Sequence, residues 1–283
     1  MVQRTPKQQI KHFLKTGESD AMPQGWPGEN WLIKAQNANR AMSEALIAEV
    51  QERSAGLPLS MAPVLDCHAF TRGKVAPMVN GLFPENERTN VIELLEKSVV
   101  FLTADNISEV LQHSASKTSW DLANLYLLSI GGKLLSRKAP AIVGLNEGTT
   151  CYVSHEYFHQ QNRFADFVVH EAAHLLHNCK RSQAGLPRTR TKENLVEIEY
   201  CQRETFAYAC EVYSRILELG ISRKDRIKLA EEVEDDFVPP GGRVDLDRFY
   251  EALAAACGAK NGWSKILQFC APPKRVKPML AKF

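Results

Sequence analysis

The chain has 283 residues, of which 44% are hydrophobic and 24% charged, with a formal net charge of +2 at pH 7. This composition is typical of globular proteins and excludes a disordered, collagen-like or coiled-coil chain. The small net charge excludes nucleic-acid binding through bulk electrostatics, so we expect no nucleic-acid partner. No apolar run approaches the roughly 18 residues of a membrane span, and no signal peptide is recognisable. Seven cysteines without a C-x-x-C pair favour reduced thiols and a cytoplasmic location.

The first half of the chain shows mainly helical periodicity. Apolar residues recur every three or four positions, and the expected helices are 7–15, 31–53, 85–101, 105–112 and 120–130. Pro58 and Pro63 indicate a linker. We therefore expect a helical arm or lid over residues 1–62 and a main domain over residues 63–283.

Two short strands are expected after this helical half. Apolar and β-branched residues over 141–145 and 149–153 flank a turn at Gly148. The helices expected to follow are 164–178, 193–219, 223–233, 245–257 and 263–269, before a solvated basic tail. The predicted fold class is α+β and predominantly helical, with a small sheet flanked by N- and C-terminal helices.

An H-E-x-x-H motif, His170 to His174, lies inside the apolar helix expected over 164–178. Its two histidines stand one helical turn apart on one face, about 6 Å along the axis, so both imidazoles can bind one zinc ion. Glu171 lies about 100° round the helix, which is the position of a general base rather than of a third ligand. The motif therefore predicts a hydrolytic zinc site.

A second copy of the motif, His155 to His159, follows the second predicted strand. Polar residues follow this copy, whereas apolar residues surround His170 to His174 on both sides. Because a dry surrounding favours activation of a metal-bound water, we assign the metal site to His170 and His174. The second copy is interpreted as a solvated loop or helix start that could line the mouth of a cleft.

A third protein ligand is required to complete such a site. His177 lies on the same helix face but is carried about 10 Å along the axis from His170, so we interpret it either as a residue that supports a ligand or as a surface residue. The helix expected over 193–219 carries glutamates every seven residues, and Glu204 is the one set among small and aromatic residues. Glu204 is the leading candidate ligand and Glu211 the alternative.

The pattern of H-E-x-x-H followed by a helical glutamate resembles the gluzincin metallopeptidases. The closer resemblance is to the ImmA/IrrE-like peptidases, because Glu204, Ala207 and Ala209 match their E-x-x-A-x-A stretch. It covers about residues 141–219, with Phe206 where that family usually has asparagine. The resemblance implies a zincin-like core in which His170, His174 and Glu204 bind Zn²⁺ and Glu171 is the catalytic base.

The expected activity is hydrolysis of a peptide or protein substrate by a zinc metallopeptidase. Tyr208, one turn beyond Glu204, is the first candidate for stabilising the oxyanion, although packing alone could account for it. By analogy with zincins, the strand 149–153 would be an edge strand that binds an extended peptide. The alternative is a non-catalytic regulatory or interaction protein that keeps a zincin-like scaffold. A basic loop over 180–192 is either an exposed connection or a site that attracts acidic partners.

Overall fold

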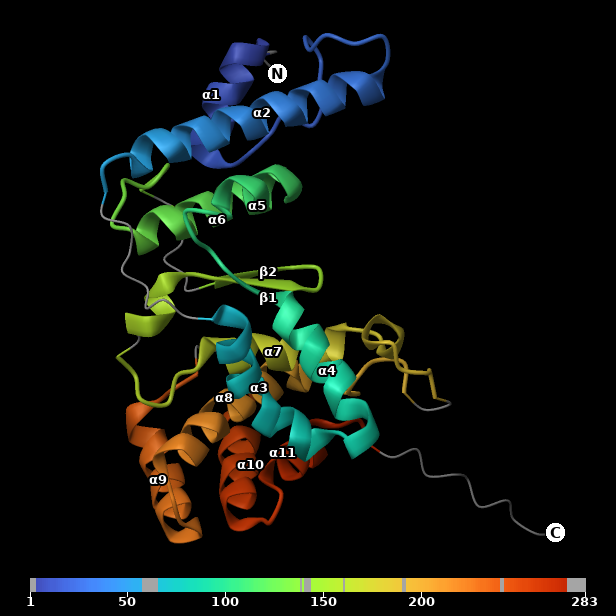
Figure 1. Cartoon of the computed structure of the whole chain (residues 1–283), viewed down its shortest axis with the longest axis vertical. Coiled ribbons are helices and arrows are strands. Elements are labelled where there is room, and N and C mark those ends of the chain that lie inside the picture. Colours follow the sequence, from blue (N-terminus) through green and yellow to red (C-terminus); the bar gives the residue numbers. More distant parts are fainter. Residues whose placement is uncertain are drawn as a thin grey trace, which may run out of the picture. The chain divides into compact units, whose positions relative to one another are not determined.

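A computed structural model describes residues 4–57, 66–137, 139, 144–159, 161–189, 192–239 and 242–273 (Figure 1). These residues form a predominantly helical α+β fold with one small sheet, which confirms the predicted class. The chain divides into two compact units, unit 1 with Met1–Cys67 and Val99–Gln160 and unit 2 with His68–Ser98 and Gln161–Phe283. This division differs from the predicted boundary at residue 62, because the chain leaves unit 1 and returns to it. The predicted linker around 58–63 lies outside the described residues.

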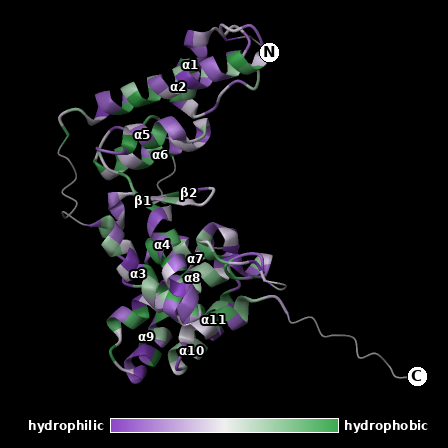
Figure 2. Cartoon of the chain, turned by 45° about the vertical axis from the view of Figure 1, so that its right-hand side comes forward, coloured by the Kyte–Doolittle hydropathy of each residue, from purple (hydrophilic) through white to green (hydrophobic). Residues whose placement is uncertain are grey.

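The described residues of unit 1 form the α-helices α1 (Pro6–Thr16), α2 (Trp31–Ser54), α5 (Ile107–His113) and α6 (Ser116–Ser129). Thr5 and Gln8 form a capping box before α1, with Pro6 at the first helical position. Hydrophilic and hydrophobic residues alternate along α2 (Figure 2), and its buried positions pack into one apolar core with α1, α5 and α6. These helices agree with the predicted ones to within a turn or so at their ends.

The sheet of unit 1 has three strands in the order β1-β3-β2. They are β1 (Val99–Phe101), β2 (Gly144–Glu147) and β3 (Thr150–Val153), with β3 parallel to β1 and antiparallel to β2. The prediction that 149–153 forms an edge strand was wrong, because β3 is paired on both sides. The helix predicted over 85–101 was also too long, since its last three residues are β-branched or aromatic and form β1.

Unit 2 is helical. Its elements are α3 (Cys67–Leu82), α4 (Glu85–Ser98), α7 (Phe167–Asn178), α8 (Arg203–Leu219), α9 (Arg223–Asp236), α10 (Leu246–Gly258) and α11 (Gly262–Cys270), with 3₁₀ turns η2 (Arg181–Ala184) and η3 (Tyr200–Gln202). The helix predicted over 193–219 begins only at Arg203. The preceding segment is not α-helical, because its Leu195 and Val196 amides donate hydrogen bonds to the C-terminal end of α7.

Helices α7 and α8 pack side by side at the centre of unit 2 (Figure 1). Both helices carry small buried residues, and Ala172, Ala173, Ala207 and Ala209 are fully buried. Small side chains let two helix backbones approach closely, so functional groups on α7 and α8 come within contact distance. None of the helices in the described ranges is both long enough and apolar enough to cross a membrane.

Candidate metal centre

The N-terminal end of α7 is fixed by Asp166, whose side chain is fully buried. Its Oδ1 accepts a hydrogen bond from the amide of Val169 at 3.3 Å and so caps the helix. Its Oδ2 accepts from the Lys74 ammonium at 2.9 Å, which ties α7 to α3. This buried charge pair sets the position of the turn that carries His170.

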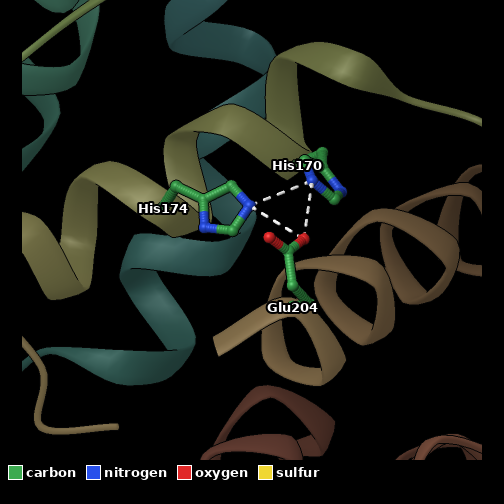
Figure 3. Close-up of side chains that lie close together, drawn as sticks. All are labelled: His170, His174 and Glu204. Carbon is green, nitrogen blue, oxygen red and sulfur yellow. Dashed lines mark hydrogen bonds and ion pairs between the residues drawn. The ribbon is translucent and has the colours of Figure 1, made fainter. Parts of the chain in front are cut away.

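His170 and His174 project from α7 towards Glu204 on the first turn of α8 (Figure 3). The two Nε2 atoms lie 3.1 Å apart. The Oε2 atom of Glu204 lies 3.5 Å from Nε2 of His174 and 3.9 Å from Nε2 of His170. The structure therefore brings together the three residues that the sequence singled out as ligands.

These distances fit a divalent metal ion. Tetrahedral coordination with ligand bonds of about 2.0–2.2 Å places neighbouring donor atoms about 3.3–3.6 Å apart. The ligand atoms of His170, His174 and Glu204 all lie within 4.8 Å of one another. Within the described ranges, this is the one group of histidine, cysteine or carboxylate side chains with that property. Three protein ligands leave a fourth position for water or substrate.

The hydrogen bonds of the two histidines direct their Nε2 lone pairs towards Glu204. Nδ1 of His170 lies 2.9 Å from Oε2 of Glu211, an acceptor, which assigns the ring proton to Nδ1. Nδ1 of His174 lies 3.0 Å from Nε2 of His177, and the His177 Nδ1 lies 3.1 Å from the Asn178 side-chain oxygen. Each Nδ1 therefore donates outwards, and each Nε2 is left as a metal donor.

Electrostatics support these roles. Burial alone lowers the pKa of His170, but the hydrogen bond and charge of Glu211, with smaller contributions from two other glutamates, raise it above 6.5. The pKa of Glu204 is lowered, chiefly by its close contact with the His174 imidazole, so this carboxyl is ionised at neutral pH. Burial, then the neighbouring charges of His174 and Arg203, lower the pKa of His177 to about 3. A neutral His177 can accept a hydrogen bond from the Nδ1–H group of His174.

Glu171 and Tyr208, the predicted catalytic residues, lie beside the three ligands. Glu171 is buried, with 8% of its surface exposed, and its charge contributes to the raised pKa of His170. The Tyr208 ring centroid lies 4.3 Å from that of His170. Burial, followed by the charges of the surrounding glutamates, raises the pKa of Tyr208 above 10.0. The phenol is therefore protonated at neutral pH and can donate a hydrogen bond.

The other candidates take different places. Glu211 contacts the Nδ1 side of His170 and is a partner of that ligand, not a member of the three-residue group. The second H-E-x-x-H copy forms a 3₁₀ helix in unit 1, in which residues four apart point about 120° apart and cannot chelate one ion. His155 is buried rather than solvated, and its ring stacks on Phe158.

The sequence offered Glu211 only as an alternative ligand, so its supporting role was not predicted. For His177 it left two roles open, support of the site or a place at the surface, and the structure shows the first. Glu211 follows Glu204 by seven residues, which is about two helical turns, so both point to the same face of α8. That spacing was the available signal. His177 lies within a turn of His174, but its hydrogen bond to that ligand depends on side-chain rotamers that no spacing rule specifies.

The chain matches no protein-family model, no curated protein and no solved structure. The arrangement of side chains on α7 and α8 is therefore the basis for assigning a function.

Proposed function

We propose that the chain is a zinc-dependent hydrolase, most specifically a metallopeptidase. The observation that carries the proposal is the convergence of His170, His174 and Glu204, with both imidazoles oriented by outer hydrogen bonds. Two histidines and one carboxylate form a ligand set typical of catalytic zinc. The peptidase assignment adds the resemblance of the H-E-x-x-H motif and Glu204 to the gluzincin pattern.

A bound zinc ion would supply a water of lowered pKa and would polarise a substrate carbonyl. The residues of the chain supply proton transfer and charge stabilisation. Glu171 is the general base that takes a proton from the attacking water and passes it to the leaving amine. The protonated Tyr208 hydroxyl donates a hydrogen bond to the oxyanion that develops on the substrate. Glu211 and His177 hold the two imidazoles in the required tautomers.

The test compares the zinc content and the hydrolytic activity of variants in the two copies of the motif. Protein purified without chelator should contain about one zinc per chain, and His170→Ala or Glu204→Ala should remove it. His159→Ala, in the exposed end of the second copy, is the matched control and should retain the zinc. Zinc retained by both ligand variants would show that the site lies elsewhere.

Hydrolysis is then measured on a mixed peptide library. Glu171→Gln should keep the zinc and lose hydrolysis by at least about 100-fold, as expected for removal of a general base. Glu156→Gln makes the same change in the second copy and should leave the rate unchanged. A zinc-loaded wild-type chain that hydrolyses no peptide would favour the non-catalytic scaffold.

A further inference from the structure

Two arginines lie next to the candidate metal centre and have not been given a role above. Arg203 is the first residue of α8 and directly precedes Glu204. Its guanidinium carbon lies 5.2 Å from the ring centroid of Tyr200, so the side chain stacks on an aromatic that is itself 83% exposed. The Arg203 Nε atom is buried and has no hydrogen-bond partner among the described residues. These residues therefore leave the half-buried Arg203 guanidinium without a full set of acceptors.

Arg243 belongs to the segment before α10, which is anchored to the start of α8. The amide of Asp245 donates a hydrogen bond to Thr205 Oγ1 at 3.1 Å, and the Gln202 amide donates to Asp245 Oδ2 at 3.3 Å. These two bonds hold residue 245 against the turn that carries Glu204. Arg243, two residues earlier, is exposed. Its charge contributes to the lowered pKa of Glu204, after the larger effect of the nearby His174 imidazole.

Neither arginine is neutralised within the part of the chain that the structure describes. No carboxylate among those residues forms an ion pair with Arg203 or Arg243 within 4.0 Å. The acidic side chain nearest to Arg243 in sequence, Asp245, already accepts hydrogen bonds from Gln202 and from the amide of Arg248, and so caps α10. Glu204 is committed to the histidines.

We propose that Arg203 and Arg243 bind a carboxylate of the substrate, so that the site acts on acidic peptides. Guanidinium groups bind carboxylates through paired, charge-assisted hydrogen bonds, and two of them flanking one site fix both affinity and orientation. Arg203 precedes Glu204, so the bound carboxylate would lie on a residue close to the bond that is cleaved. This inference rests on the proposed zinc hydrolase function and names its substrate class.

The binding test uses two hydroxamates of equal chain length, which attach to zinc through the same group. Glutaric monohydroxamate ends in a carboxylate and pentanohydroxamate in a methyl group. Titration calorimetry on the zinc-loaded full chain should show the carboxylate probe binding about tenfold more tightly or better, as expected for charge-assisted hydrogen bonds at a partly exposed site. The preference should shrink in high salt, which screens exposed charges.

Variants assign that preference to the two arginines. Arg203→Gln and Arg243→Gln should each lower the preference several-fold, and the double variant should abolish it while zinc content stays at the wild-type value. Arg243 makes no contact within the described fold that would be needed for stability, so its variant is informative even if Arg203→Gln folds poorly. Arg223→Gln removes an exposed arginine from α9 and is the matched control.

Peptide pairs that differ only in glutamate or glutamine next to the cleaved bond give a second readout. Wild type should favour the glutamate peptide in kcat/KM by about tenfold, mainly through KM, and the double variant should treat both alike. Equal binding of the two hydroxamates by wild type would overturn the inference and leave the hydrolase proposal standing. If neither probe binds the zinc-loaded chain, the open metal site itself is absent and both proposals fail.

Discussion

The Nδ1 atom of His170 lies 2.9 Å from Oε2 of Glu211, and both side chains are more than 90% buried. The other carboxylate oxygen of Glu211 accepts a hydrogen bond from the amide of Asp166 at 2.8 Å. Glu211 therefore joins the start of α7 to one proposed ligand on it. A carboxylate in this position fixes the orientation of the imidazole and strengthens it as a donor.

Replacing Glu211 by glutamine should weaken zinc binding by about 10–100-fold, the usual effect of losing an outer partner of a metal-binding histidine. The amide can still accept a hydrogen bond, but it carries no charge to stabilise the metal-bound imidazole. Competition with a chromophoric chelator measures the change. Glu231→Gln, an exposed change on α9, should leave the affinity unaltered. Equal affinities in the two variants would contradict the role of Glu211.

On acidification, zinc affinity should begin to fall at a higher pH than it does at an ordinary histidine site. Because the pKa of His170 is raised above 6.5, a proton competes with the metal at pH values where a typical imidazole is already neutral. Glu204, whose pKa is lowered below 4.5, stays ionised through this range. As the pH is lowered, the zinc affinity of wild type should begin to fall while the pH is still above 6.5. In Glu211→Gln the fall should begin at a lower pH. An onset that the variant does not move would contradict this explanation.

The same shift gives the metal-free protein the opposite pH dependence. The folded chain holds the His170 proton more tightly than the unfolded chain does, so this group stabilises the fold below pH 6.5. That contribution is lost as the pH rises through the raised pKa. As the pH rises through this range, the free energy of unfolding of the metal-free protein should therefore decrease, while that of the zinc-loaded protein should increase.

His177 should matter less for zinc binding than Glu211, because it is a neutral acceptor for His174. His177→Phe keeps a ring in this buried position and removes the acceptor, and we expect about a tenfold loss of zinc affinity. His113→Phe, at the end of α5, is the control and should have no effect. A loss as large as that of Glu211→Gln would show that charge is not what distinguishes the two partners.

Local sequence patterns predicted most helices, because capping residues and apolar spacing act over a few positions. They failed where distant contacts decide the conformation. Helix α3 was not predicted, since Gly73, Pro77 and Gly81 interrupt its pattern. Residues 193–202 show apolar spacing typical of a helix. The amides of Leu195 and Val196 nevertheless donate their hydrogen bonds to carbonyls at the end of α7 and not within a helix of their own. Strand β1 likewise depends on pairing with β3, which lies about 50 residues later.

The candidate metal centre shows the same limit. The i, i+4 spacing placed His170 and His174 on one face of a helix, and the surroundings of Glu204 marked it as buried. Both patterns are local, and the structure brings these residues together, although the Glu204 side chain is 30% exposed rather than buried. The arginines beside the site are different, because Arg243 lies 39 residues from Glu204 and is placed only by the hydrogen bonds of Asp245. No spacing rule relates two such positions.

An ion pair between Arg181 and Glu87 should contribute strongly to the stability of unit 2. The Arg181 side chain is 3% exposed and donates to both oxygens of Glu87 at 2.6 and 3.1 Å, which joins η2 to α4. Glu87→Ala leaves a buried guanidinium without its counter-charge. Removing one partner of a buried pair costs about 3–5 kcal/mol, and because Glu87 is 18% exposed we expect about 3 kcal/mol.

Urea unfolding of Glu87→Ala and of Glu93→Ala, an exposed glutamate on the same helix, separates charge burial from helix propensity. The control should change the free energy of unfolding by less than about 0.5 kcal/mol. The double variant Arg181→Leu with Glu87→Leu removes both charges at once and should recover part of the loss, because no buried charge is left unpaired. A Glu87 variant no less stable than the Glu93 variant would mean that solvent reaches the guanidinium and that the pair holds α4 only weakly.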